Sequence, residues 1–337
     1  MNNLTRHIFL LCLLLAGLWS CQPKTRQPET PEPGTLEPGT IIEVPAFNPD
    51  SAYAFVEAQC DFGPRVPGTP SHAACAEYLE NMLGRFSPHV QVQSFRSRAF
   101  DGTVLNGKNI IASFQPEKRA RLMLCAHWDS RPFADHDPDP AKRNQPVMGA
   151  NDGASGVGVL LEVARLLSAN EPRIGVDIIF FDLEDYGPPN DNQTEAKNEH
   201  WGLGSQHWSR NPHVYNYRPR YVILLDMVGA ADATFRQEGF SMHFAPDKVK
   251  KVWDIAHRLG YKDYFPKERG SFINDDHYFI NEIARIPAIN IIHLDPNSSN
   301  GSFFEYWHTT EDTMDKIDSR TLGVVGDVVI QTLFMEK

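Results

Sequence analysis

The chain has 337 residues, of which 41% are hydrophobic, and its formal net charge at pH 7 is −11. A chain of this length can bury a sizeable core in one large domain or two small ones, and its negative charge argues against a nucleic-acid-binding protein. An acidic surface mainly keeps a protein soluble and says little about its substrate.

The first 50 residues lack the pattern of a folded domain. Residues 1–20 hold basic residues and then an apolar run too short to span a bilayer, which is typical of a signal peptide. The small residue Ser20 precedes Cys21, as in a bacterial lipoprotein signal, so we expect a lipid anchor on Cys21; ordinary cleavage is the alternative. Residues 21–50 are rich in Pro, Thr, Glu and Gly and predict a tether. Such a protein would be exported and anchored in the bacterial cell envelope, facing the periplasm.

The cysteines do not suggest a metal site. The chain has five, at Cys12, Cys21, Cys60, Cys75 and Cys125, and no two form a CxxC pair. Cys125 follows three apolar residues and is expected in the core. Cys60 and Cys75 could pair in an oxidising compartment, which the sequence leaves open. Catalytic groups must therefore come from other residue types.

Residues 51–337 have the pattern of one mixed α/β domain. Two amphipathic helices are predicted first, at 51–63 with Ser51 as the N-cap, and at 72–86. Apolar runs rich in β-branched residues follow at 90–95, 108–114, 121–129, 176–185, 221–229 and 286–295, with helical stretches at 155–170 and 247–260. Nearly all-apolar strands that alternate with helices predict a mixed, mostly parallel central sheet flanked by helices on both faces.

Several of the predicted strands end in acidic residues or histidine. These residues are His127, Asp129, Asp182 to Asp185, Asp226, His293 and Asp295. One acid after a strand is commonly the cap of the next helix, but here four strand ends deliver such groups. Because ligands of open α/β sheets bind at the carboxyl ends of the strands, the sequence predicts a polar site at this edge.

Three segments supply ligands of the kind that a catalytic zinc uses. Asp152 lies in the glycine-rich turn GANDGASGVG, which lacks a phosphate-loop motif; a helix cap is its alternative role. Glu184 and Asp185 follow a buried run, and one could bind a metal while the other faces the substrate; a solvated acidic turn is the alternative. His308 lies in EYWHTTEDT, which has neither a helical nor a strand period. One imidazole and two carboxylates leave a fourth position open on zinc, although manganese would also suit them.

The order of the motifs along the chain resembles a known family. His127-Trp128-Asp129, GANDGASGVG, DLEDYG, LLDMVG, NDDH and YWHT follow one another, and FGPRVPGTPSH precedes them. Over nearly everything after residue 50 this is similar to the zinc-aminopeptidase-like fold of the M28 clan. Its aminopeptidases hold two zincs and hydrolyse an N-terminal residue, whereas its glutaminyl cyclases hold one zinc and convert N-terminal Gln to pyroglutamate with release of ammonia.

Two motifs favour the cyclases over the aminopeptidases. Trp307-His308-Thr309 and the paired aspartates Asp275-Asp276 resemble the cyclase pattern, and the chain looks most like the bacterial cyclases of lipoprotein type. The resemblance implies a zinc-dependent glutaminyl-peptide cyclotransferase that acts on peptides or proteins with N-terminal Gln, with one zinc per chain. We expect a monomer. A two-zinc aminopeptidase and a non-catalytic binding lipoprotein are the alternatives.

The resemblance also implies a role for each site residue. The metal ligands would be Asp152, Asp185 and His308, where Asp185 stands in place of the more usual Glu. Glu184 would transfer protons, while Asp226 and Asp275 would bind the γ-amide nitrogen and share a short hydrogen bond.

The remaining residues would shape and support the pocket. Trp307 and Trp201 would contact the substrate, and so would His293, which could instead support the pocket from behind. His127 and Asp129 would orient the groups behind the substrate. In two-zinc relatives His127 would instead be a metal ligand together with Asp226.

Overall fold

The computed structural model describes residues 44–189 and 197–337. The predicted signal peptide, Cys21 and residues 21–43 of the predicted tether lie outside the described residues. Within the described ranges, no helix is both long enough and apolar enough to cross a membrane. The folded part begins earlier than the expected boundary at residue 51, because the Phe47 ring is buried against Gly326.

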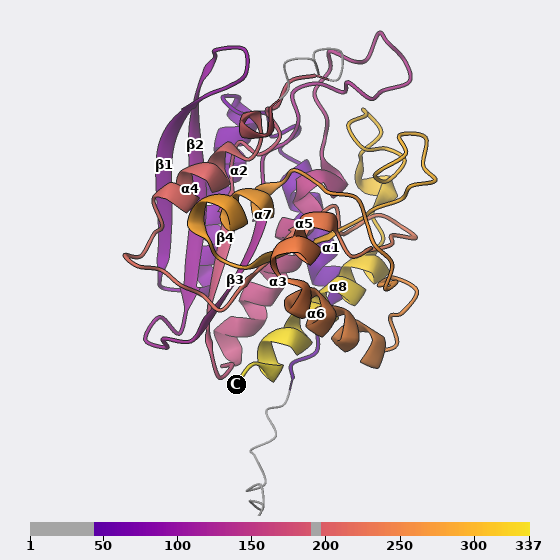
Figure 1. Ribbon diagram of the computed structural model, residues 1–337. Helices are drawn as coiled ribbons and strands as arrows, with labels where there is room; N and C mark the ends of the chain where they lie inside the picture. Colours follow the sequence, from indigo (N-terminus) through magenta and orange to yellow (C-terminus); the bar gives the residue numbers. More distant parts are fainter. Residues whose placement is uncertain (1–43, 190–196) are drawn as a thin grey trace, which may run out of the picture. The chain divides into compact units, whose positions relative to one another are not determined.

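One six-stranded sheet forms the centre of the fold, in the order β1-β2-β4-β3-β5-β6 (Figure 1). Strands β3, β4, β5 and β6 pair in parallel, whereas β1 and β2 add to β4 as an antiparallel pair at one edge. The strand bounds are β1 Val90–Arg98, β2 Val104–Phe114, β3 Arg121–His127, β4 Gly175–Phe181, β5 Val222–Asp226 and β6 Ala288–Ile292. The predicted mixed, mostly parallel α/β sheet is confirmed.

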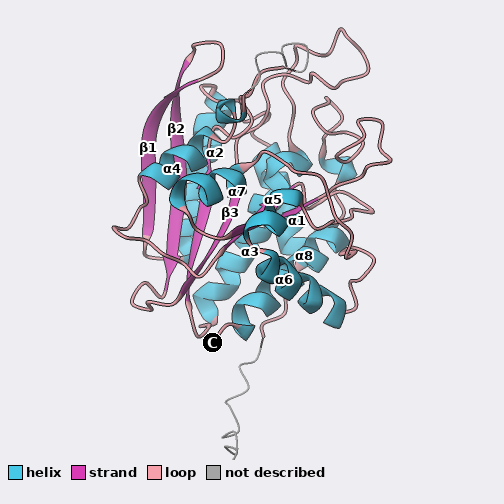
Figure 2. Ribbon diagram, in the orientation of Figure 1, coloured by secondary structure: helices cyan, strands magenta, loops and turns pink. Residues whose placement is uncertain are grey.

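Helices cover both faces of this sheet (Figure 2). Helices α1 (Pro49–Cys60), α2 (Pro70–Phe86), α3 (Gly156–Ala169), α6 (Pro246–Arg258) and α8 (Ser319–Met335) pack together on one face. Helices α4 (Leu203–Arg210), α5 (Gly239–Phe244) and α7 (Asp276–Phe279) lie on the other. Successive strand side chains alternate between these two layers: Leu124 belongs to the first core, whereas Met123 and Cys125 belong to the second.

Local chemistry explains how the helices begin and how closely they pack. Helix α1 begins two residues before the expected cap, because the Asn48 side chain, not that of Ser51, accepts hydrogen bonds from the first-turn amides. Helix α3 crosses the sheet closely enough that a Cβ on Gly156 would lie 2.3 Å from the Leu225 carbonyl oxygen, and a Cβ on Gly158 would lie 2.5 Å from Val56. Glycine is therefore required at both positions.

The cysteines that the structure describes are buried free thiols. Burial raises the pKa of Cys60 to about 11 and that of Cys75 to about 12. The thiolate forms are therefore scarce at neutral pH, and Cys60 and Cys75 serve as small core residues.

Candidate active site

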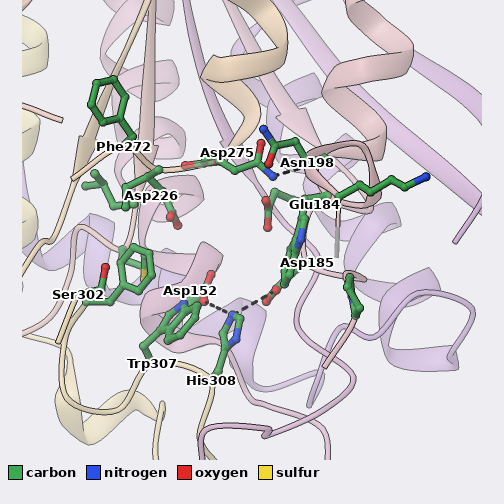
Figure 3. Close-up of a pocket in the computed structure, with 18 residues that line it drawn as sticks. Asp152, Glu184, Asp185, Asn198, Asp226, Phe272, Asp275, Ser302, Trp307 and His308 are labelled. Atoms are coloured by element: carbon green, nitrogen blue, oxygen red, sulfur yellow. Dashed lines mark hydrogen bonds and ion pairs between the residues drawn. The ribbon is translucent and has the colours of Figure 1, made fainter. Parts of the chain in front are cut away.

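A pocket of about 510 Å³ lies at the carboxyl ends of the parallel strands. Its floor is acidic and its walls carry two tryptophans (Figure 3). Eight of the predicted site residues line it: Asp152, Glu184, Asp185, Trp201, Asp226, Asp275, Trp307 and His308. The turn before α3, the loops after β4 and β6, the last residue of β5 and the N-cap of α7 bring these residues together at this edge of the sheet.

Asp152, Asp185 and His308 form a group with metal-ligand geometry. His308 Nε2 lies 3.5 Å from Asp152 Oδ2 and 3.3 Å from Asp185 Oδ1, and one ligand atom from each residue lies within 4.8 Å of the others. All three side chains are buried, and Asp185 Oδ2 has no hydrogen-bond partner among the described residues. Two buried carboxylates and an imidazole with a free oxygen fit a divalent cation, and this donor set suits zinc.

His308 is aimed by a carboxylate on its far side. Its Nδ1 lies 3.5 Å from Asp135 Oδ1, and Arg131 holds Asp135 with hydrogen bonds of 2.7 and 2.8 Å. A carboxylate behind a metal-binding imidazole fixes the ring and directs the other nitrogen at the metal. No motif in the sequence indicates Arg131 or Asp135 as site residues, although both follow Asp129 closely in the same loop.

The Asp152 turn is tied to the loop that carries His308. The Asp312 carboxylate accepts hydrogen bonds from the backbone amides of Asn151 (2.8 Å) and Asp152 (3.1 Å). Burial, together with the nearby Asp152 carboxylate, raises the pKa of Asp312 to about 7. Because Asp312 lies four residues after His308, one buried side chain fixes the spacing of two candidate ligands.

Asp129 lies behind the two adjacent carboxylates and bonds to their backbone. Its carboxylate accepts hydrogen bonds from the amides of Glu184 (3.1 Å) and Asp185 (3.2 Å), so it orients both adjacent carboxylates. The preceding Leu183 has a left-handed backbone, with φ of 59°. This sharp turn lets Glu184 and Asp185 diverge after the buried strand.

His127 lies in a second acidic group that shares Asp152 with the first. His127 Nε2 is 3.0 Å from Asp152 Oδ1 and 3.3 Å from Asp226 Oδ1. One ligand atom from each of the three residues lies within 4.8 Å of the others, as in the first group. Burial alone would lower the pKa of His127, but Asp129, Asp152 and Asp226 raise it well above its ordinary value. This geometry suits either an imidazolium that neutralises the acids or a second metal.

Three further carboxyl groups surround the centre of the pocket. Burial is the main cause that raises the pKa values of Glu184, Asp226 and Asp275, and the negative charge of Asp275 raises those of the other two further. The Asp275 oxygens accept hydrogen bonds from Asn290 Nδ2 at 2.6 Å and from the Asp276 amide at 2.5 Å. Among the described residues, these are the hydrogen bonds of the Asp275 carboxyl. The expected short hydrogen bond between Asp275 and Asp226 is not formed in this structure, and Asp275 acts on Asp226 as a neighbouring negative charge.

The tryptophans flank His308, whereas His293 lies behind the pocket wall. The Trp307 ring is stacked 3.7 Å from the His308 ring, and the Trp201 ring lies nearly parallel to it at 6.4 Å. His293 is buried against Phe304, and burial lowers its pKa to about 4. Its neighbour Ile292 lines the pocket in its place, so the expected contact between His293 and substrate is not supported by this geometry.

A buried ion pair supports the segment that carries Asp275. His277 Nε2 lies 2.8 Å from Glu238, which also accepts a hydrogen bond from the Ile273 amide at 2.9 Å. Burial alone would raise the pKa of Glu238, but the facing His277 and the backbone amides lower it to about 2. Burial opposes the charge on His277, yet Glu238 raises its pKa.

Replacing His277 by Gln should destabilise the protein by about 3–5 kcal/mol, because Glu238 would remain buried without its cation. The Glu238 contribution is complete above its ordinary pKa of 4.5 and is lost as pH falls toward about 2. The variant should therefore differ less from the parent near pH 3 than near pH 6, as measured by denaturant unfolding. His89→Gln, at an exposed position, is the control and should change stability by less than about 0.5 kcal/mol. An equal loss at both pH values would contradict the ionic account.

Comparison with known proteins agrees with this site. The model of peptidase family M28 matches residues 109–333, and the chain belongs to this family. It is also similar to a solved glutaminyl cyclase of Bacteroides thetaiotaomicron, with 51% identity, a TM-score of 0.85, and coverage of 88% of this chain and 100% of that one. A glutaminyl-peptide cyclotransferase of Drosophila melanogaster is 27% identical over 285 residues, which are 77% of this chain and 73% of that protein.

Not every similar structure is named as a glutaminyl cyclase. A chain from Bacteroides thetaiotaomicron described as a leucine aminopeptidase precursor is 50% identical, with a TM-score of 0.85, and the match covers 88% of this chain and 100% of that one. Similar proteins are therefore named both as cyclases and as peptidases, and the chemistry of the pocket has to distinguish the two activities.

Proposed function

We propose that this chain is a glutaminyl-peptide cyclotransferase, which converts the N-terminal Gln of peptides and proteins to pyroglutamate and releases ammonia. The observation that carries the proposal is the arrangement of Glu184, Asp226 and Asp275 in one pocket walled by Trp201 and Trp307, in a chain 51% identical to a glutaminyl cyclase. Cyclisation needs acidic groups near both the α-amine and the γ-amide nitrogen of the substrate Gln, and this pocket supplies them.

We further propose one zinc per chain, held by Asp152, Asp185 and His308. When bound there, zinc supplies Lewis-acid polarisation of the substrate's γ-carbonyl. Asp129, Asp135 and Asp312 keep the ligands in place through the contacts described above.

In the reaction the substrate's own α-amine attacks its γ-amide carbon. A bond forms between that nitrogen and carbon, and the bond from the carbon to the amide nitrogen breaks. Glu184 removes one proton from the α-ammonium and passes it to the departing nitrogen, which leaves as ammonia, and the attacking nitrogen loses its second proton to solvent. Proton transfer by a positioned group of this kind contributes about 10²- to 10⁴-fold.

The other pocket residues hold the substrate in a curled conformation. Asp226 and Asp275 accept hydrogen bonds from the γ-amide nitrogen and prepare it to leave. Trp307 and Trp201 close over the small side chain and exclude water, so that the α-amine is the nucleophile nearest to the carbonyl carbon. Holding the α-amine against the γ-amide carbon removes the conformational freedom that would otherwise oppose ring closure.

The proposed protein is exported and acts as a monomer. The predicted signal at 1–20, a lipid on Cys21 and a tether at 21–50 would place the catalytic domain, residues 51–337 with the short preceding segment, at the bacterial cell envelope. Mass spectrometry of the N-terminal peptide from cell membranes would detect the lipid on Cys21 or its absence.

A two-zinc aminopeptidase is the second candidate, because His127, Asp152 and Asp226 form a second group with metal-ligand spacing. Incubation with a peptide that begins with Gln separates the two functions. We expect ammonia and a peptide of unchanged residue number with a blocked N-terminus. Release of free N-terminal residues would contradict the cyclotransferase.

A further inference from the structure

A polar residue lies in the middle of the apolar strand β6 (Ala288–Ile292). Asn290 is fully buried, and all the other residues of the strand are Ala or Ile. A buried side-chain amide lowers stability unless its polar atoms are hydrogen-bonded. Its Nδ2 donates to Asp275 Oδ2 at 2.6 Å, while Oδ1 has no hydrogen-bond partner among the described residues. The residue is therefore incompletely satisfied, and its one strong bond goes to a pocket carboxyl.

Hydrogen bonds through Ser241 and Glu238 also connect the backbone of β6 with the backbone of the segment that carries Asp275. Ser241 Oγ accepts a hydrogen bond from the Asn290 amide at 2.9 Å and donates one to Glu238 at 2.7 Å. Glu238 in turn accepts from the amide of Ile273, two residues before Asp275. The loop that carries Asp275 and the amide that contacts its carboxyl are thus fixed relative to each other.

The Asp275 carboxyl needs such a donor because it lies among negative charges. Glu184 and Asp226 line the same pocket and repel it. The Asp276 amide bonds only Oδ1, so without a second donor the carboxyl could turn away from its acidic neighbours. The bond from Asn290 Nδ2 to Oδ2 supplies this second donor and sets the plane of the carboxyl.

We propose that Asn290 is a positioning residue for cyclisation, whose side-chain amide holds the Asp275 carboxyl in the orientation that receives the γ-amide of the substrate Gln. The inference rests on the proposed cyclotransferase activity and extends it to a residue that does not touch the substrate. Neither Leu nor Asp can replace Asn: leucine has no donor, and aspartate would place a second carboxylate against the first.

The test compares kcat/KM for a Gln-initiated peptide in Asn290→Asp and Asn290→Leu with the parent protein. We expect a loss of about 10²-fold in both, because a misplaced catalytic group costs this much. Asn281→Asp is the matched control: Asn281 is also buried, but its amide donates only to the backbone carbonyls of His277 and Ala288. Asn281→Asp should keep kcat/KM within about threefold of the parent value, although it should lose about as much thermal stability as the Asn290 variants.

A double-mutant cycle separates positioning from a general loss of structure. In an Asp275→Ala background, Asn290→Leu should change kcat/KM by less than about threefold, because the group it positions is gone. The inference would be overturned if the reduction in kcat/KM of the double variant equalled the product of the reductions in the two single variants. Full activity of Asn290→Asp would also overturn it. If Asn290→Leu fails to fold, the near-isosteric Asn290→Asp and its combination with Asp275→Ala carry the same test. A parent protein that does not cyclise the peptide would instead refute the proposed function.

Discussion

Replacing Glu184 by Gln is expected to lower kcat for cyclisation by about 10²- to 10⁴-fold, the range that a positioned general base supplies. Glutamine keeps the size of the side chain and its place on the turn that Asp129 holds, but it cannot accept the proton of the α-ammonium. Because cyclisation requires a neutral amine, the loss should appear in kcat more than in KM.

The metal content of the same variant separates this role from metal binding. Glu184→Gln should bind zinc as the parent does, since the proposed ligands are Asp152, Asp185 and His308. Glu171→Gln, on the surface beside Lys118, is the matched control and should keep full activity. Normal turnover in Glu184→Gln would remove Glu184 from the mechanism, and loss of zinc would make it a ligand.

Replacing His308 by Ala is expected to lower zinc affinity by at least about 10²-fold, because the site then loses one of its three protein ligands. Activity at limiting zinc should fall accordingly. The control is His89→Ala, which removes an exposed imidazole and should not change affinity. Chelator treatment followed by added zinc should restore the parent protein fully. An alanine variant with unchanged zinc affinity would show that the metal binds elsewhere.

Much of the fold could be predicted because it follows from short-range patterns. Strands β3 to β6 are apolar, buried runs, and the helices between them imply parallel pairing, so the sequence predicts these four strands. The exact ends of the helices and strands were harder to predict. Ser51 has the chemistry of an N-cap, but Asn48 takes that role because Pro49 can begin the helix after it.

The site was predictable where a residue lies at a strand end or shortly after it. Asp226 ends β5 and Asp185 follows soon after β4, and the topology of the sheet brings them together. The supporting groups were not predictable, because their contacts depend on the fold. Asp312 bonds to an amide 160 residues away, and Asn290 in β6 bonds to Asp275 across the helical segment between them. Such contacts depend on backbone turns, including the left-handed conformation of His308 itself, that no local pattern indicates.

His293 shows the limit of an argument from strand ends. It follows β6 directly, yet it does not line the pocket, whereas its neighbour Ile292 does. Successive side chains at a strand end point in opposite directions, so one position decides between the pocket and the interior.

The central claim, a single zinc that serves ring closure, is tested most directly by titrating metal-free protein with zinc while cyclisation and hydrolysis are both followed. Pyroglutamate formation should rise to its full rate at one zinc per chain, with no shortening of the peptide and no change on adding more. A rate that requires two zincs per chain, together with release of free N-terminal residues, would contradict the account and make the chain an aminopeptidase.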